Sequence, residues 1–268
     1  MKLRLTLPLI AILLISCQSK YKTWSFDTEI SLGKIAPIGI TKTTHGYWLS
    51  DGDNNRIILL NNELDVIDEQ GGFDRPMHLT SYHSKLYIPE YGSDKITIVN
   101  ATDIDTLSIP FALDAPAGVD VNGNEIAIAD FYKHRILFFD GSQWLEIGQK
   151  GHELGGLYYP TDVQLIHDMI VVADAYNNRI QFFSKNGAVL KQIGKEQQMN
   201  AATGIFCTKH EIYVTDFENN RVLAFDYEGN VLQELEQGLR MPTDIYVEKD
   251  KLLITNYKNK SIVMYHSF

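Results

Sequence analysis

One pattern recurs six times along this chain of 268 residues and constrains its fold more than any other feature. Each copy is an apolar run followed by an acidic residue, a short polar turn and a basic residue. The first positions of the copies are Pro37, Pro76, Pro116, Pro160, Ala202 and Pro242. The acidic positions are Asp51, Glu90, Asp130, Asp174, Asp216 and Asn256, and the basic positions are Arg56, Lys95, Arg135, Arg179, Arg221 and Ser261. All three columns advance in steps of 39, 40, 44, 42 and 40 residues, a period typical of repeat architectures.

The local pattern within each copy predicts strands and not helices. In the fifth copy, residues 211–216 and 221–226 alternate apolar and polar side chains in steps of two and are rich in β-branched and aromatic residues. Asn219 and Asn220 lie between them and favour a tight turn, because Asn tolerates left-handed backbone. A further strand is expected over 231–236. Four short strands per copy, which we label A to D, are typical of one propeller blade, and six copies predict six blades.

The last copy ends with its third strand, over residues 261–268, so its blade lacks strand D. The missing strand is predicted at the other end of the chain, where residues 23–30 alternate in the same way. Closing the ring in this manner hides a sheet edge that would otherwise pair with other chains. The sequence therefore predicts an all-β fold: a six-bladed β-propeller of four-stranded antiparallel blades over residues 23–268, with the N-terminal strand completing the last blade.

The acidic and basic columns vary together. Four copies pair Asp with Arg, one pairs Glu with Lys, and the last has Asn with Ser. This indicates a physical pair that brackets the turn between strands B and C. We expect these pairs to be exposed scaffolding of the turn, contributing about 0–1 kcal/mol each, and none of the acids to be catalytic.

Several copies resemble the NHL repeat family of six-bladed propellers. The resemblance lies in the segments LSDGDNNRIILL, IADFYKHRILFF, VADAYNNRIQFF and VTDFENNRVLAF, and in the approach IGQKGHELGGLYYPTDV at 147–163. It covers residues 21–268 and implies the propeller fold. It leaves function open, because NHL-type propellers bind RNA, proteins or small molecules, and a few are enzymes.

The start of the chain is typical of a secretory signal. Lys2 and Arg4 precede an apolar stretch of about a dozen residues, shorter than a membrane span. The stretch ends in Leu-Ile-Ser-Cys at Cys17, which resembles the lipobox of bacterial lipoproteins, and an ordinary signal peptide is the alternative. The resemblance implies a signal peptide over 1–16, a lipid on Cys17, a short tether over 17–22 and attachment to the cell envelope. Gln18 after the cysteine favours the outer membrane over the inner one.

Charge argues against nucleic acid as a partner. The formal net charge is −10, and removing Lys2 and Arg4 with the leader leaves −12. Phosphate backbones are bound by clustered positive charge, which this chain lacks. The second cysteine, Cys207, is expected to pack in an A strand, so no disulfide is predicted. We expect a monomer without cofactors.

Aromatic residues gather at the turns between strands B and C. In a propeller these turns share one face of the disc, here called the top face, with the loops that join strand D to the next strand A. The candidate binding residues on this face are Tyr91, Phe131, Tyr132, Tyr176, Phe217 and Tyr257. Exposed rings would form a binding surface. The alternative is that they fold down and cover the edge of the core.

Two positions of the A strands bear on metal binding. The amidating lyases built on related propellers carry zinc on histidines directly after the A-strand proline, and no histidine occupies that position here. At the next position Gly alternates with His78, Asp162 and Asp244, a threefold pattern that would suit a divalent metal. Strand alternation predicts that these three side chains point into the packing between blades, where Asp would accept backbone hydrogen bonds. We therefore expect no metal, with these three residues as the alternative site.

Three functions are compatible with the sequence. The first is a lipid-anchored binding or scaffold module that holds a peptide, protein or glycan at its top face, and we expect no catalysis. The alternative is a hydrolase or lyase, similar to the lactonases and amidating lyases built on related propellers, with its site at the mouth of the channel. The third is a purely structural role.

Overall fold

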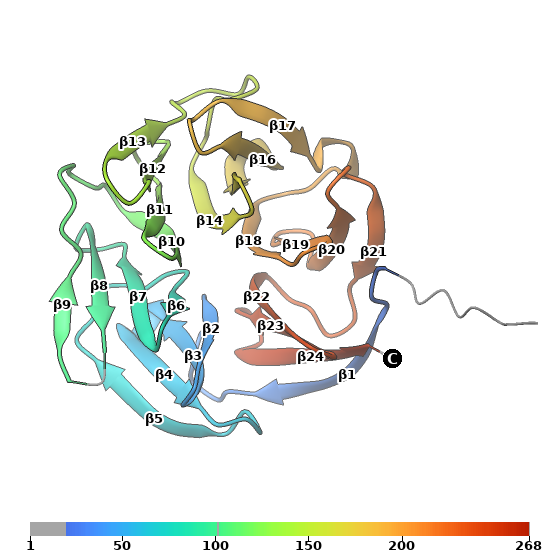
Figure 1. Ribbon diagram of the computed structural model, residues 1–268. Coiled ribbons are helices and arrows are strands. Elements are labelled where there is room, and N and C mark those ends of the chain that lie inside the picture. Colours follow the sequence, from blue (N-terminus) through green and yellow to red (C-terminus); the bar gives the residue numbers. More distant parts are fainter. Residues whose placement is uncertain (1–19, 101, 268) are drawn as a thin grey trace, which may run out of the picture.

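The computed structural model describes residues 20–100 and 102–267, and these form a ring of six four-stranded antiparallel sheets (Figure 1). The predicted six-bladed β-propeller is confirmed. Its innermost strands, the A strands, are β2 (Ile40–Thr43), β6 (Thr80–Tyr82), β10 (Pro116–Asn122), β14 (Pro160–Ile166), β18 (Ala202–Cys207) and β22 (Pro242–Glu248). No helix among the described residues is long and apolar enough to cross a membrane.

The other strands follow outward in chain order, except that β1 is the outermost strand of the sixth blade. The B strands are β3 (Gly46–Asp51), β7 (Lys85–Glu90), β11 (Glu125–Asp130), β15 (Met169–Asp174), β19 (Glu211–Asp216) and β23 (Lys251–Asn256). The C strands are β4 (Arg56–Leu60), β8 (Lys95–Val99), β12 (Arg135–Phe139), β16 (Arg179–Ser184), β20 (Arg221–Asp226) and β24 (Ser261–Ser267). The D strands are β5 (Val66–Gly71), β9 (Ile104–Thr106), β13 (Trp144–Ile147), β17 (Val189–Ile193), β21 (Val231–Leu235) and β1 (Trp24–Ser31). Short 3₁₀ turns cover Gly52–Asn54, Ala175–Asn177 and Lys195–Gln197.

The N-terminal strand closes the ring as predicted. Strand β1 pairs antiparallel with β24, in a register that runs from Trp24 opposite Ser267 to Ser31 opposite Ser261 (Figure 1). Trp24 is buried, and its Nε1 donates a hydrogen bond of 2.8 Å to the hydroxyl of Tyr213 in the neighbouring blade. Because β1 begins beside the end of a C strand, the chain enters the propeller from the face opposite the top face.

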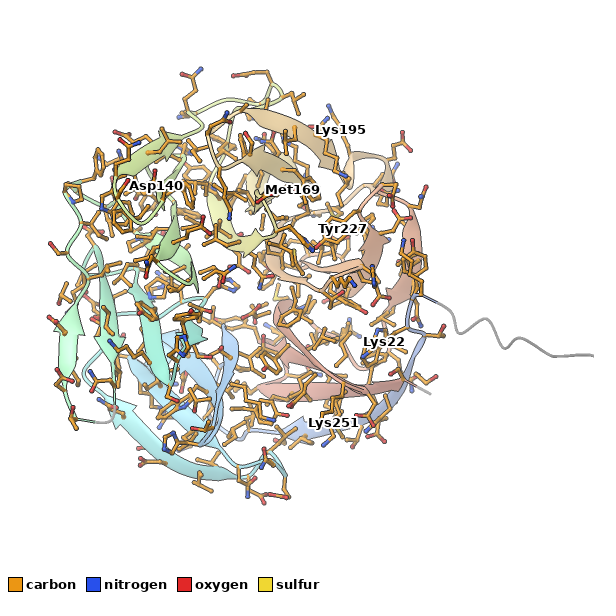
Figure 2. The ribbon with its side chains drawn as sticks, viewed as in Figure 1. Lys22, Asp140, Met169, Lys195, Tyr227 and Lys251 are labelled. Atoms are coloured by element: carbon orange, nitrogen blue, oxygen red, sulfur yellow. The ribbon has the colours of Figure 1, made fainter. Side chains whose placement is uncertain are left out.

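The hydrophobic core is divided into clusters that lie between neighbouring blades. One cluster joins Val171 and Phe182 of blade four to Ile212 and Phe225 of blade five. Another joins Leu49 of blade one to Leu253 of blade six. Side chains fill the space between the strands of the ring (Figure 2). Each blade therefore buries its apolar faces only with its neighbours present, which explains why the fold needs the whole ring.

The predicted acid–base pairs are present, and their acidic members are buried. Asp51, Asp130, Asp174 and Asp216 each accept a hydrogen bond of 2.6–2.8 Å from the Nε of the paired arginine, and the four carboxylates are fully buried. In the last blade the amide of Asn256 donates to the hydroxyl of Ser261. The expectation that the pairs are exposed is wrong for the acids, each of which also accepts a backbone N–H from the loop that precedes strand A.

That second bond recurs in all six blades. The carboxylate or amide oxygen accepts the N–H of a residue that lies one or two positions before the first position of the copy. The donors are Ala36, Asp74, Asp114, Tyr158, Asn200 and Arg240. The buried acid therefore ties the B–C turn to the D–A loop of its own blade, and this builds the top face.

A second contact, here called the turn latch, joins each of the first five blades to the next. The residue before the basic position has left-handed backbone, and its side chain accepts an N–H from the next blade's D–A loop. The acceptors are Asn55, Asp94, His134, Asn178 and Asn220. In the sixth blade Lys260 occupies this position, and its backbone carbonyl accepts the N–H of Leu32. The latches hold the loops of neighbouring blades in a fixed relation.

Candidate functional site

The aromatic residues predicted on the top face are gathered mainly over blades two to four. Tyr91, Phe131, Tyr132 and Tyr176 belong to one network of ring contacts, with centroid separations such as 5.7 Å between Tyr91 and Phe131 and 5.0 Å between Phe131 and Tyr132. Phe217 and Tyr257 lie apart from it and contact each other at 6.5 Å. The hydroxyl of Tyr257 donates to Asp53.

Two further rings, which the sequence prediction missed, join this network. Tyr158 and Tyr159 lie in the D–A loop just before β14, and Tyr159 contacts Phe131 at 4.8 Å and Tyr176 at 5.0 Å. They could have been found, because D–A loops share the top face with the B–C turns. We call Tyr91, Phe131, Tyr132, Tyr158, Tyr159 and Tyr176 the aromatic cluster.

Exposure divides these rings into two groups. Tyr132 and Tyr176 are 49% and 59% exposed, so their side chains are available to a partner. Tyr91, Phe131 and Tyr159 are partly buried and support them. Most contacts in the network are edge-to-face or tilted, an arrangement that aromatic pairs prefer. The cluster is therefore a supported surface with two projecting tyrosines.

His134 fixes one side of the aromatic cluster. Its Nδ1 is the turn-latch acceptor for the N–H of Tyr159 at 3.0 Å, and its ring stacks on Tyr158 with an interplanar angle of 7°. Burial lowers the pKa of His134, and the ammonium of Lys150 lowers it further. The neutral form, which can accept the Tyr159 N–H, is therefore favoured at neutral pH.

Cations lie against the rim of the aromatic cluster although the chain as a whole is acidic. The guanidinium of Arg75 lies 4.8 Å from the centre of the Tyr91 ring, and the ammonium of Lys150 lies 5.7 Å from that of Tyr158. Lys133, next to Tyr132, makes a half-exposed ion pair with Asp114 at 3.5 Å. The surface thus combines exposed tyrosines with positive charge.

A second group of candidate residues meets at the axis of the ring. His78, Asp162 and Asp244 come from blades two, four and six, and each offers one ligand atom within 4.8 Å of the others. All three are buried. The expectation that they point apart into the blade packing is wrong, because the A strands approach the axis closely enough for their side chains to meet. The expected role of Asp as a backbone acceptor is confirmed.

Each aspartate of this group, here called the channel triad, is held by two backbone donors. Asp162 accepts the N–H of Val163 in its own strand and of Ile205 in the next blade. Asp244 accepts the N–H of Ile245 and, across the closure, of Ile40. These bonds fix both carboxylates on the strands that surround the axis.

Burial and the charges of neighbouring groups shift the pKa values of His78 and Asp162 in the channel triad. Burial raises the pKa of Asp162 to about 7, with His78 opposing and Asp244 adding to this effect. For His78, burial alone would lower the pKa, but the carboxylates of Asp244 and Asp162 outweigh it and the net shift is upward. A shared proton or cation is therefore favoured among the three groups.

The glycines that alternate with the channel triad explain how the strands come so close. A Cβ on Gly118 would lie 2.8 Å from the Cα of Asp162, and one on Gly204 would lie 2.8 Å from the Cα of Asp244. Both contacts are with backbone, so a side chain there would force the strands apart. Glycine on three blades thus makes room for His and Asp on the other three.

The channel triad lines a cavity of about 220 Å³ that receives residues from all six A strands. The lining also includes the polar side chains of Asp120, Thr80, Ser81 and Gln164. Burial raises the pKa of Asp120 to about 6. Beside the cavity, Cys207 lies on β18 as predicted, its N–H bonded to Gln164, and burial raises the pKa of its thiol.

The predicted lipid attachment site, Cys17, lies outside the residues that the structure describes. So do the predicted signal peptide and the start of the tether.

Comparison with known proteins supports the fold. No family model matches the chain. A stretch of 125 residues is 31% identical to Protein brain tumor of Drosophila melanogaster, covering 44% of this chain and 12% of that protein. The chain thus spans about an eighth of the length of this curated relative. The match supports a propeller of the NHL type.

Among solved structures, streptogramin B lyase has a TM-score of 0.69 at 16% identity, covering 91% of this chain and 98% of that one. An auxiliary nutrient binding protein from Bacteroides thetaiotaomicron has a TM-score of 0.67 at 12% identity, covering 87% and 69%. A propeller in a nidogen/laminin complex has a TM-score of 0.63 at 16% identity, covering 75% and 81%. At these identities the likeness is one of fold, and the chain is a six-bladed β-propeller similar to both enzymes and binding proteins.

Proposed function

We propose that this protein is a lipid-anchored binding module of the bacterial cell envelope, and that its aromatic cluster binds a protein or peptide. The observation that carries the proposal is the pair of exposed tyrosines, Tyr132 and Tyr176, supported from below by packed rings. Rigid tyrosines supply large contact area at low entropic cost and are frequent in binding hot spots.

The geometry of the rings favours a protein or peptide over a glycan. A glycan platform presents ring faces side by side to flat sugar rings, whereas rings in this cluster meet at steep angles, such as 63° between Tyr159 and Tyr176 and 84° between Tyr132 and Tyr159. Projecting tyrosine edges and hydroxyls fit the irregular surface of a polypeptide. The cations at the rim, Arg75 and Lys150, favour a partner that carries acidic groups.

A catalytic role at the channel is less well supported. The cavity of about 220 Å³ is smaller than the range of about 300–1,000 Å³ that is usual for ligand pockets. A lyase and a nutrient binding protein share this fold, so the fold itself allows either function. The aromatic surface is what favours binding.

The lipid anchor orients the proposed surface. Since β1 begins on the face opposite the aromatic cluster, a lipid on Cys17 would hold that opposite face toward the membrane and turn the cluster away from it. Mass spectrometry of the protein made in a bacterial host tests this part. We expect the mature chain to begin at lipidated Cys17, and a mature chain that begins elsewhere without lipid would contradict it.

Selection of a displayed peptide library against the purified protein tests the binding surface. We expect the selected peptides to be rich in acidic and aromatic residues and to lose about 100-fold in affinity for the double variant Tyr132→Ser/Tyr176→Ser, about 2–3 kcal/mol. The matched control is Ile67→Ser/Leu190→Ser, which removes similarly exposed apolar side chains on outer strands. Peptides that bind both variants equally well would contradict the proposal, and binding in a glycan array instead would assign the cluster to sugars.

A further inference from the structure

We propose that the channel triad, His78, Asp162 and Asp244, binds a divalent metal ion of the zinc or manganese type at the axis of the propeller. This inference goes beyond the proposed function, because the triad and its cavity are built from the A strands and share no residue with the aromatic cluster. Four structural observations carry it.

The first is a buried nitrogen without a hydrogen bond. The Nδ1 atom of His78 is the one buried side-chain nitrogen or oxygen in the described part of the chain that makes no hydrogen bond. His78 is 4% exposed, so water does not solvate the ring from the surface. A buried polar atom left unpaired costs about 1–3 kcal/mol, and a ligand at this point would remove the cost.

The second is the spacing of the ligand atoms. The Nδ1 of His78 lies 3.6 Å from the Oδ2 of Asp244, which is too long for a hydrogen bond. Two ligands of one tetrahedral ion at about 2.0–2.1 Å lie about 3.4 Å apart. The third ligand atom, on Asp162, lies within 4.8 Å of the others.

The third is charge. Asp162, Asp244 and Asp120 bring three carboxylates into the cavity, and its described lining includes no lysine or arginine. Unpaired charges are expensive to bury. A divalent cation would neutralise the two carboxylates of the channel triad and leave His78 as a neutral ligand.

The fourth is preorganisation. All four carboxylate oxygens of Asp162 and Asp244 already accept one backbone N–H each. These donors fix the carboxylates, and each oxygen keeps a second lone pair that can face the ion. Such support of metal ligands by fixed hydrogen bonds is typical of metal sites.

The ligand types select the class of metal. One imidazole and two carboxylates suit zinc or manganese better than calcium or magnesium, which prefer oxygen ligands. Three protein ligands also leave a coordination position open toward the cavity, where water or a small ligand oxygen could bind. Because the three ligands come from alternate blades, the ion would also cross-link the ring.

Calorimetric titration of the chelator-treated protein with zinc, manganese, calcium and magnesium chlorides tests the proposal. We expect one site per chain for zinc or manganese, with a rise in melting temperature, and much weaker binding of calcium and magnesium. His78→Gln should weaken zinc or manganese binding about 100-fold or more, since even outer-shell changes cost about 10–100-fold. His152→Ala, on the surface, is the control and should bind as the parent does.

Cobalt provides a readout that does not depend on stability. Bound Co²⁺ should give visible absorption bands of low symmetry, and His78→Gln should change them even if its melting temperature is unaltered. His78 is the preferred test residue because its side chain, unlike those of Asp162 and Asp244, makes no hydrogen bond to a neighbouring strand. Absence of stoichiometric zinc or manganese binding would overturn the proposal. Binding by His78→Gln as tight as that of the parent would also overturn it.

Discussion

The Nδ1 atom of His78 on blade two lies 3.6 Å from the Oδ2 atom of Asp244 on blade six, although 166 positions separate these residues in the chain. The contact exists because the blade between them carries Gly39 at the same position. A Cβ there would lie 2.8–2.9 Å from the backbone of Met77 and His78. Polar and glycine positions that alternate around the axis therefore create one shared site from three separate repeats.

Loss of the closing strand's anchor should destabilise the whole ring. We expect Trp24→Ala to lower the free energy of unfolding by about 3–5 kcal/mol, as for other buried large-to-small changes, because Trp24 is buried and bonded to Tyr213. Urea unfolding measures this. Ser25→Ala, on the exposed side of the same strand, is the control and should change stability little. An equally small effect of both changes would contradict closure by β1.

The acid–base pairs should differ in strength according to burial. Arg179 is 2% exposed and donates to Asp174 and to the carbonyls of Glu153 and Gly156. We expect Arg179→Met to cost about 3–5 kcal/mol, because it leaves a buried carboxylate without its partner. The side chain of Lys95, paired with Glu90 at 3.3 Å, is 40% exposed. Without it Glu90 keeps the hydrogen bonds from the Asp74 N–H and the hydroxyls of Ser93 and Thr97, so Lys95→Met should cost about 1 kcal/mol or less. Equal costs in urea unfolding would contradict this dependence on burial.

The sequence predicted the fold in detail because the fold is built from six copies of one repeat. The period, the turn residues and the paired columns each recur, so one copy supports the interpretation of another. The strand over residues 23–30 was predicted because the sixth copy shows only three strands. Pairing between Asp51 and Arg56 followed in the same way. Their burial did not follow, because it depends on the loops before the A strands, whose sequences do not repeat.

The candidate sites were harder to predict because they depend on distances across the ring. Alternation along one strand says which side of that strand a residue occupies, and it wrongly directed Asp162 away from the axis. Gly118 and Gly204 determine how closely the A strands approach one another, but glycine has no functional side chain that would mark these positions in the sequence. Tyr158 and Tyr159 were not predicted because they lie in the loop before β14, outside the repeated acid-to-base turns.

Asp120 should make stability depend on pH. Burial raises its pKa to about 6 in the folded protein, above the usual value of about 3.9. The folded state therefore binds this proton more tightly than the unfolded chain, so its contribution to stability falls as pH rises from about 4 to 6 and is constant above. Asp120→Asn should gain about 2 kcal/mol relative to the parent between pH 4.5 and 7.5.

Melting temperatures of both proteins at these two pH values measure the effect of Asp120. The control is Asp140→Asn on the surface, where hydrogen bonds from Gln143 and Ser142 lower the pKa of the carboxyl. That carboxyl stays charged across this range, so its variant should show the same difference from the parent at both pH values. If the melting temperatures of the parent and of Asp120→Asn change equally between the two pH values, Asp120 does not titrate in this range.

His134 should couple the aromatic cluster to pH, because its Nδ1 can accept the Tyr159 N–H only when unprotonated. Its pKa is lowered in the folded state by burial and by Lys150, with Asp174 opposing. The corresponding stability is fully present above about pH 6.5 and is lost as pH falls through the lower folded-state pKa.

We expect the near-ultraviolet circular dichroism of the tyrosines to weaken as pH falls to 5. His134→Asn supplies the acceptor that Asn178 and Asn220 provide in the equivalent latches, and should keep the signal at pH 5. Loss of the signal in both proteins at the same pH would show that another group controls the cluster.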